Sequence, residues 1–172
     1  MTGAKEIGAA LWIDRLQLER HPEGGYFRQT YRCAEEVSAP GLPSRFAGPR
    51  PYSTAIYFLL EAGDVSVLHR LQSDELWFHH AGGTALVHAI SPDGALRTQR
   101  LGRELGNGDA LQAQVPRGLW FGAELAPGAP YVLGSCTVSP GFDFAEFEMA
   151  RRADLVAQFP AHAGLITRLT RR

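Results

Sequence analysis

Residues 63–82 contain the side chains best suited to chemistry, a histidine and a carboxylate on either side of a short turn. Residues 65–71 alternate and are rich in β-branched and apolar side chains, which is typical of a half-buried strand. After the turn, a second strand is expected over residues 75–80. Because alternate side chains of a strand share a face, His69 and Glu75 are expected to meet between these strands. An imidazole beside a carboxylate can form either a metal site or an acid–base pair.

The rest of the chain predicts the short strands that would hold this pair. Strands are expected at residues 26–32, 53–60, 85–90, 96–101, 111–115, 119–124, 131–138 and 142–148, with glycine and proline turns between many of them. Many short strands at regular spacing are typical of a sandwich or a barrel. Helices are expected at residues 5–18 and 153–159, and residues 39–51 form a proline-rich loop.

Composition narrows the class of protein. The 172 residues are expected to form one domain, with 45% apolar and 20% charged residues. A net charge of -1 does not show the excess of positive charge that is typical of nucleic-acid-binding proteins. No apolar run approaches the roughly 20 residues that span a bilayer, and charged residues near the start argue against a signal peptide. We therefore expect a cytoplasmic protein without nucleic-acid or membrane partners, with Cys33 and Cys136 as reduced thiols.

Five ordered segments resemble one protein family. Gly63, His69, Glu75 and Gly82 fit the first motif of the cupins, and residues 116–121 resemble the second, Pro-x-Gly-x-x-His. Residues 21–32 (HPEGGYFRQTYR), 53–60, 69–77, 115–124 and 137–148 resemble the Cupin_5 (DUF985) group of the RmlC-like cupins. The resemblance implies an all-β double-stranded β-helix, the cupin jelly-roll barrel, with short N- and C-terminal helices. It would place an N-terminal helix and strand at residues 4–32, the barrel at 53–148 and a helical segment at 150–172.

Metal binding is the usual use of these motif positions in cupins, where three histidines and a glutamate hold a divalent transition metal. Leu71 and Phe121 stand at two of the four ligand positions. His79 has the strand parity to replace one ligand, and His80 is adjacent should the strand be bulged. His69, Glu75 and His79 would form a two-His-one-carboxylate set suited to non-haem iron. The alternative is a polar pocket that has lost the metal.

Metal-free chemistry is the second implication of the resemblance. RmlC-like epimerases use a histidine base with a tyrosine acid inside the barrel. Here His69 could be the base, oriented by Asp74 or Glu75, since a carboxylate neighbour fixes the tautomer and raises basicity. Tyr57 or Tyr26 could be the acid, although tyrosines in strands more often serve packing.

Further residues could contact a ligand. Arg28 could hold an anionic group by paired hydrogen bonds, and Trp77 and Trp120 could wall a pocket, although large aromatic residues in strands are usually core. The leading hypothesis is an epimerase or isomerase acting on a carbohydrate-like or polar metabolite. The alternatives are a metal-dependent enzyme, such as an oxygenase or isomerase, and a non-catalytic metabolite-binding protein. The resemblance also implies a homodimer in which residues 26–32 pair across a two-fold axis.

Overall fold

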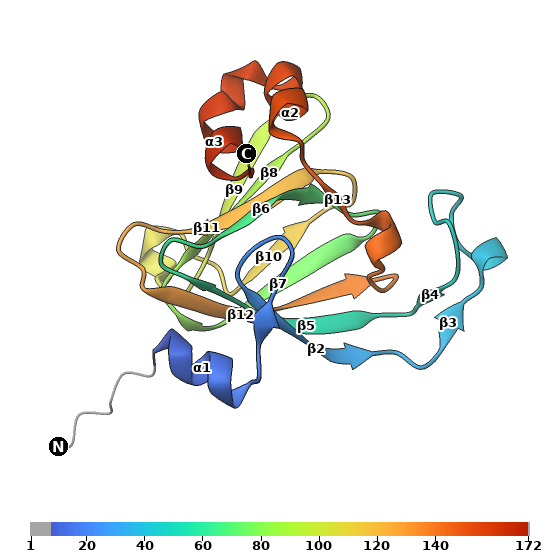
Figure 1. Ribbon diagram of the computed structural model, residues 1–172, viewed down its shortest axis with the longest axis horizontal. Coiled ribbons are helices and arrows are strands. Elements are labelled where there is room, and N and C mark those ends of the chain that lie inside the picture. Colours follow the sequence, from blue (N-terminus) through green and yellow to red (C-terminus); the bar gives the residue numbers. More distant parts are fainter. Residues whose placement is uncertain (1–7, 172) are drawn as a thin grey trace.

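Two antiparallel sheets face each other in the computed structural model, which describes residues 8–171 (Figure 1). The first sheet has the order β1 (Glu19–Arg20), β2 (Tyr26–Arg32), β5 (Thr54–Glu61), β12 (Tyr131–Ser139), β7 (Asp74–Gly82), β10 (Gln112–Val115). The second has the order β13 (Glu148–Met149), β6 (Val65–Arg70), β11 (Trp120–Leu125), β8 (Ala85–Ile90), β9 (Leu96–Leu101). The predicted all-β cupin barrel with short terminal helices is confirmed.

The alternation of side chains along β6 and β7 directs His69 and Glu75 into the barrel. Along β7, Glu75, Trp77 and His79 are buried while Asp74, Leu76 and His80 are exposed, as the alternation of a strand requires. On β6, His69 is 2% exposed and lies opposite Phe121 of β11. Both members of the predicted pair therefore point into the barrel.

Three hydrophobic clusters stabilise this arrangement. The largest fills the barrel and includes Phe58, Trp77 and Phe121. A second lies under α2 (Arg152–Gln158) and α3 (Ala163–Arg168), which sit together at the top of Figure 1. The third lies under α1 (Ala9–Arg15), on the outer face of the first sheet. None of the helices in residues 8–171 is long and apolar enough to cross a membrane.

Several element predictions need correction. The N-terminal helix was expected over residues 5–18, but α1 ends at Arg15, and residues 5–7 lie outside the described part. A terminal helix was expected over residues 153–159; α2 ends at Gln158, and η4 (Pro160–His162) and α3 follow it, with Leu169 fully buried. The strand expected over residues 142–148 is a turn of 3-10 helix, η3 (Phe144–Glu146), followed by the two residues of β13.

The proline-rich loop is also more ordered than its composition indicates. It carries η1 (Ala39–Gly41) and a two-stranded ribbon of β3 (Glu36–Val37) and β4 (Arg50–Pro51). Phe46 and Arg50 within it are buried. A further 3-10 turn, η2 (Leu105–Asn107), connects β9 to β10.

Candidate functional site

A cavity of about 80 Å³ lies inside the barrel, between the two sheets. Polar side chains from several elements reach it, and phenylalanines form much of its apolar wall. Its polar residues are His21, Glu23, Gln29, Thr54, His69, Glu75 and Cys136. Since a cavity needs only roughly 10–15 Å³ to hold one water, this cavity can hold several waters or a small ligand.

Glu23 and His69 form the central polar contact. The Oε2 atom of Glu23 lies 3.3 Å from Nε2 of His69, and its Oε1 atom accepts a hydrogen bond of 2.8 Å from Ser66. His69 Nδ1 donates to the backbone carbonyl of Val67 at 2.7 Å, because a carbonyl can only accept. Nε2 of a neutral His69 is therefore an acceptor facing a carboxyl group. Glu75, which was expected to make this contact, has no hydrogen bond to His69.

The tight turn at residues 21–25 positions Glu23. The Glu23 carbonyl accepts from the Val67 N–H at 2.9 Å, so this loop of the first sheet reaches across to β6 of the second. At Gly24, φ is +107°, and a Cβ atom would lie 2.1 Å from the Val65 carbonyl oxygen. Only glycine allows so close an approach at this backbone angle.

His21 enters the cavity from the same turn. The backbone N–H of Glu23 donates to His21 Nδ1 at 3.1 Å. Burial lowers the pKa of His21, so the ring is neutral at neutral pH and carries its hydrogen on Nε2. The ring also packs edge-on against Phe27, with ring centroids 4.4 Å apart. His21 therefore supplies a donor where His69 supplies an acceptor.

Glu75 is the second buried carboxyl group. Its Oε2 atom is buried and has no hydrogen-bond partner among the described residues. Burial, together with the nearby charge of Glu23, raises the pKa of Glu75 to about 8. The Cys136 thiol is a hydrogen-bonding neighbour of Glu75, and burial raises the thiol pKa well above its usual value. Glu75 is therefore a neutral acid at neutral pH.

The two buried carboxyl groups differ in their proton affinity. Burial raises the pKa of Glu23 to about 6, with the His21 charge and the Ser66 hydrogen bond opposing it. Burial lowers the pKa of His69 to about 4. Above about pH 6 neither Oε2 of Glu23 nor Nε2 of His69 carries a proton, whereas Glu75 keeps its proton up to about pH 8. The cavity thus holds a proton acceptor and a proton donor at neutral pH.

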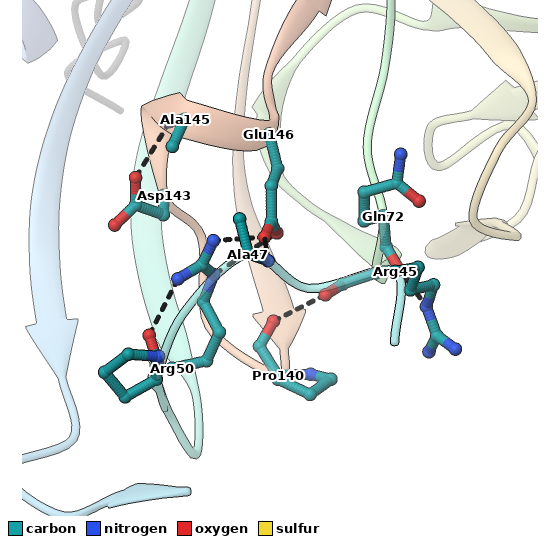
Figure 2. A network of polar contacts seen from close by, with 10 residues as sticks. Arg45, Ala47, Arg50, Gln72, Pro140, Asp143, Ala145 and Glu146 are labelled. Carbon is teal, nitrogen blue, oxygen red and sulfur yellow. Dashed lines mark hydrogen bonds and ion pairs between the residues drawn. The ribbon is translucent and has the colours of Figure 1, made fainter. Parts of the chain in front are cut away.

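An aromatic cap, residues 142–147, covers the mouth of the cavity. Phe142, Phe144 and Phe147 all line it, and the Phe147 ring lies 5.2 Å from the His69 ring. Figure 2 shows how the cap is anchored: Arg50 forms an ion pair with Glu146, and the Ala47 N–H donates to the same carboxylate at 3.1 Å. Both charged side chains of this pair are largely buried. The proline-rich loop therefore fixes the position of the cap.

Other predicted site residues lie outside the cavity. Tyr57, expected as an acid, lies on the outer face of β5 in a groove with Trp12 and His80. Tyr26 packs in the cluster under α1, with the Arg20 guanidinium 3.9 Å from its ring centre. Arg28 donates to the carbonyl of Leu16 and to Gln17 near α1. The structure does not bring these three residues to His69.

The remaining candidates belong to the core. Trp77 is buried in the barrel cluster and packs edge-on against Phe58, while Trp120 lies in the cluster under α2 and α3. His79 points inward, but four residues of extended strand place it roughly 13 Å from Glu75 along β7. Its Nε2 donates to the Gly83 carbonyl at 3.0 Å.

The residues do not fit the usual cupin metal centre. Leu71 lines the cavity where a second histidine would stand, and the Phe121 ring packs 4.1 Å from the His69 ring. Within residues 8–171, no group of three or more His, Cys, Asp or Glu side chains is arranged to hold a metal ion. The predicted set of His69, Glu75 and His79 is not assembled.

Sequence reasoning missed His21, Glu23 and Cys136. The available signal was a glutamate directly before two glycines, because such a pair permits a close backbone approach that can bury the preceding side chain. On β2 the inward residues are Phe27 and Gln29, one position from the predicted Tyr26 and Arg28.

Comparison with known proteins identifies the family and supports the fold. The family model Cupin_5, described as Cupin superfamily (DUF985), matches residues 10–150. A hypothetical protein from Leishmania major is 37% identical, with a TM-score of 0.87 over 96% of this chain and 100% of that one. Protein SO0799 from Shewanella oneidensis is 39% identical, with a TM-score of 0.86 over 96% of this chain and 98% of that one.

One more distant solved structure supports the fold alone, whereas a yeast relative supports the family. Oxalate decarboxylase of Bacillus subtilis is 18% identical, with a TM-score of 0.52 over 87% of this chain and 36% of that enzyme. The uncharacterized protein YML079W of Saccharomyces cerevisiae is 30% identical over 151 residues, which are 83% of this chain and 75% of the yeast protein. The family model and the yeast relative show that the chain belongs to the Cupin_5 (DUF985) family of the cupin superfamily.

Proposed function

We propose that the cavity catalyses proton transfer on a small polar, carbohydrate-like metabolite, the reaction of an isomerase or epimerase. The observation that carries this proposal is the 3.3 Å contact between Glu23 and His69 beside the buried, unpartnered Glu75. Two titratable sites whose environments separate their pKa values are the usual arrangement for acid–base catalysis.

Each residue has a role that follows from its protonation state. The Glu23–His69 pair removes a proton from a carbon next to a carbonyl group, because its facing acceptors hold no proton above about pH 6. Val67 fixes the tautomer of His69 through Nδ1. Glu75 donates its proton to the carbonyl oxygen as the enol forms. To complete the isomerisation, the Glu23–His69 pair returns its proton to the former carbonyl carbon. The Glu75 carboxylate takes the proton of the neighbouring hydroxyl group as the new carbonyl forms.

The aromatic cap supports this chemistry by excluding water. The rings of Phe142 and Phe147 contact the barrel core and line the cavity beside His69. A water-poor cavity strengthens hydrogen bonds to the developing enolate oxygen. It also keeps Glu75 protonated, since burial is the main cause of its raised pKa.

Hydrogen–deuterium exchange at carbon tests the proposal. A panel of small hydroxyketones and aldoses is incubated with the protein in D₂O, and loss of the C–H signal next to the carbonyl is followed by NMR. We expect exchange in at least one compound, with a rate that rises as pH increases through about 6 and falls through about 8.

Variants distinguish catalysis from background exchange. Glu23→Gln and Glu75→Gln should each reduce the rate by at least about 100-fold, the typical contribution of one acid or base. His80→Gln, on the outer face of β7, is the matched control and should leave the rate unchanged. Saturable ligand binding without exchange in any compound would contradict the proposal and favour a non-catalytic binding protein.

A further inference from the structure

We infer that the substrate is a small uncharged hydroxycarbonyl compound, without phosphate, carboxylate or ammonium groups; this inference rests on the proposed function. It follows from the charges, hydrogen-bonding groups and size of the cavity.

The cavity offers no positive charge to an anion. None of its lining residues is an arginine or a lysine, and its two carboxyl groups, Glu23 and Glu75, would face any anion that entered. The buried guanidinium of Arg50 does not line the cavity and is already paired with Glu146. Bringing a phosphate or carboxylate next to buried carboxyl groups without a counter-charge is costly.

A cation would disable the proposed acid. Glu75 is protonated at neutral pH because it is buried near Glu23 without a positive partner. An ammonium group beside it would favour the carboxylate and remove the proton that the reaction needs. A neutral substrate leaves the proton in place.

The hydrogen-bonding groups match a hydroxycarbonyl compound. Protonated Glu75 and His21 Nε2–H supply donors for a carbonyl oxygen, whereas Glu23 and His69 Nε2 supply acceptors for a hydroxyl group. The phenylalanine rings of the wall and cap can cover a short carbon chain. A cavity of about 80 Å³ favours a compound of only a few carbons with their oxygens.

Three probes of almost equal size and different charge test the inference. They are hydroxyacetone, which is neutral, pyruvate, which is an anion, and aminoacetone, which is a cation at neutral pH. Binding to the intact protein is measured near pH 7 by ligand-observed NMR. We expect hydroxyacetone to bind at least about tenfold more tightly than either charged probe, the equivalent of about 1.4 kcal/mol.

A pH series with one variant tests the role of Glu75. Hydroxyacetone affinity of the wild type should fall between about pH 7 and pH 9, as the Glu75 donor is lost. Glu75→Gln keeps an N–H donor that does not titrate, so its affinity should stay within about twofold over the same range. His80→Gln should follow the wild type.

The outcomes separate the two proposals. Hydroxyacetone binding that is no tighter than that of pyruvate or aminoacetone, including no saturable binding at all, overturns the neutral-substrate inference. The expected binding order without carbon exchange supports the ligand class and contradicts only the isomerase proposal. Exchange found only in charged compounds contradicts the inference and leaves acid–base catalysis standing.

Discussion

Glu23 is held at both carboxylate oxygens, which explains why so small a turn can organise the cavity. One oxygen contacts His69 and the other accepts from Ser66, while the Glu23 backbone binds Val67. His69 is fixed in turn by the Val67 carbonyl. A base whose tautomer and partner are both fixed needs little rearrangement before it accepts a proton.

The turn depends on Gly24, and a matched pair of glycine substitutions tests this. Gly24→Ala must relieve a 2.1 Å contact with the Val65 carbonyl as well as the strain of a φ of +107°. Gly63→Ala has a similar φ of +93° but open space around its Cβ, so it should cost only about 1–2 kcal/mol of unfolding free energy. We expect Gly24→Ala to be clearly more destabilising in urea unfolding. Equal losses of unfolding free energy in the two variants would mean that the turn does not make a close contact with β6.

Glu75 should make stability depend on pH. Its pKa is raised from 4.5 to about 8 in the folded state, so the folded protein binds this proton more tightly than the unfolded chain. The resulting stabilisation is complete below about pH 4.5 and is lost as pH rises through about 8. Between about pH 5 and pH 9, the unfolding free energy of the wild type should therefore fall by a few kcal/mol relative to that of Glu75→Gln. Parallel stability curves for the two proteins would show that Glu75 ionises normally.

Among the residues of the cavity, sequence analysis placed His69 and Glu75 on the inward faces of their strands, which the structure shows. His69 and Glu75 followed from strand parity, since alternation in β6 and β7 leaves one choice of inward face. Glu23 could not be found in this way, because it lies in a turn whose path depends on contact with β6. Arg28 was proposed although it faces outward, one residue from the inward Gln29; a strand accessible from both sides offers no apolar pattern to decide its parity.

Among the elements, the aromatic cap depends on tertiary contacts more than the strands do. Residues 142–147 contain one turn of 3-10 helix, and their attachment comes from Arg50, Ala47 and the packing of Phe142 and Phe147. Phe144 is 56% exposed, so only two of its three phenylalanines pack well.

Substitution of Glu146, with substitution of the nearby Glu148 as a control, tests whether the ion pair with Arg50 anchors the cap. Glu146→Gln leaves the buried Arg50 without its charged partner, and breaking such a pair typically costs about 3–5 kcal/mol. Glu148→Gln removes the exposed ion pair with Arg70 and should change stability by less than about 1 kcal/mol. Hydrogen exchange of the cap amides should increase in the first variant only. Similar exchange and stability in both variants would contradict the anchoring role of Arg50.

Strands were predictable where alternation or an apolar run continues over six or more residues. β2, β8 and β9 have the expected bounds, and β5, β6, β7 and β12 differ from expectation by only a few residues. The cap was predicted as a strand because it follows a Pro-Gly turn and is rich in phenylalanine. Its ion pair with the proline-rich loop joins positions 96 residues apart, which local pattern cannot reveal.

At the scale of the whole molecule, one of the open sheet edges in the described part of the chain belongs to β2. β1 pairs with β2 only at Tyr26 and Phe27, so the outer edge of residues 28–32 is open. Unpaired edges tend to pair with another chain. This edge is where the resemblance to cupins implies dimerisation.

Light scattering tests dimerisation. We expect a mass of twice the 18.8 kDa chain at micromolar concentration, because pairing of two β2 strands about a two-fold axis would cover both edges. A monomer mass under these conditions would contradict the prediction.

The most direct test is an NMR titration of the ring nitrogens of His69 and the carboxyl carbon of Glu75, between about pH 4 and pH 9. The account predicts a neutral His69 with Nε2 unprotonated at neutral pH, consistent with its lowered pKa, and a Glu75 carboxyl that titrates near pH 8. Glu75→Gln serves to assign the carboxyl signal. A His69 ring that is cationic at neutral pH, or a Glu75 that titrates near its ordinary value of 4.5, would contradict the presence of a base beside a protonated acid in this cavity.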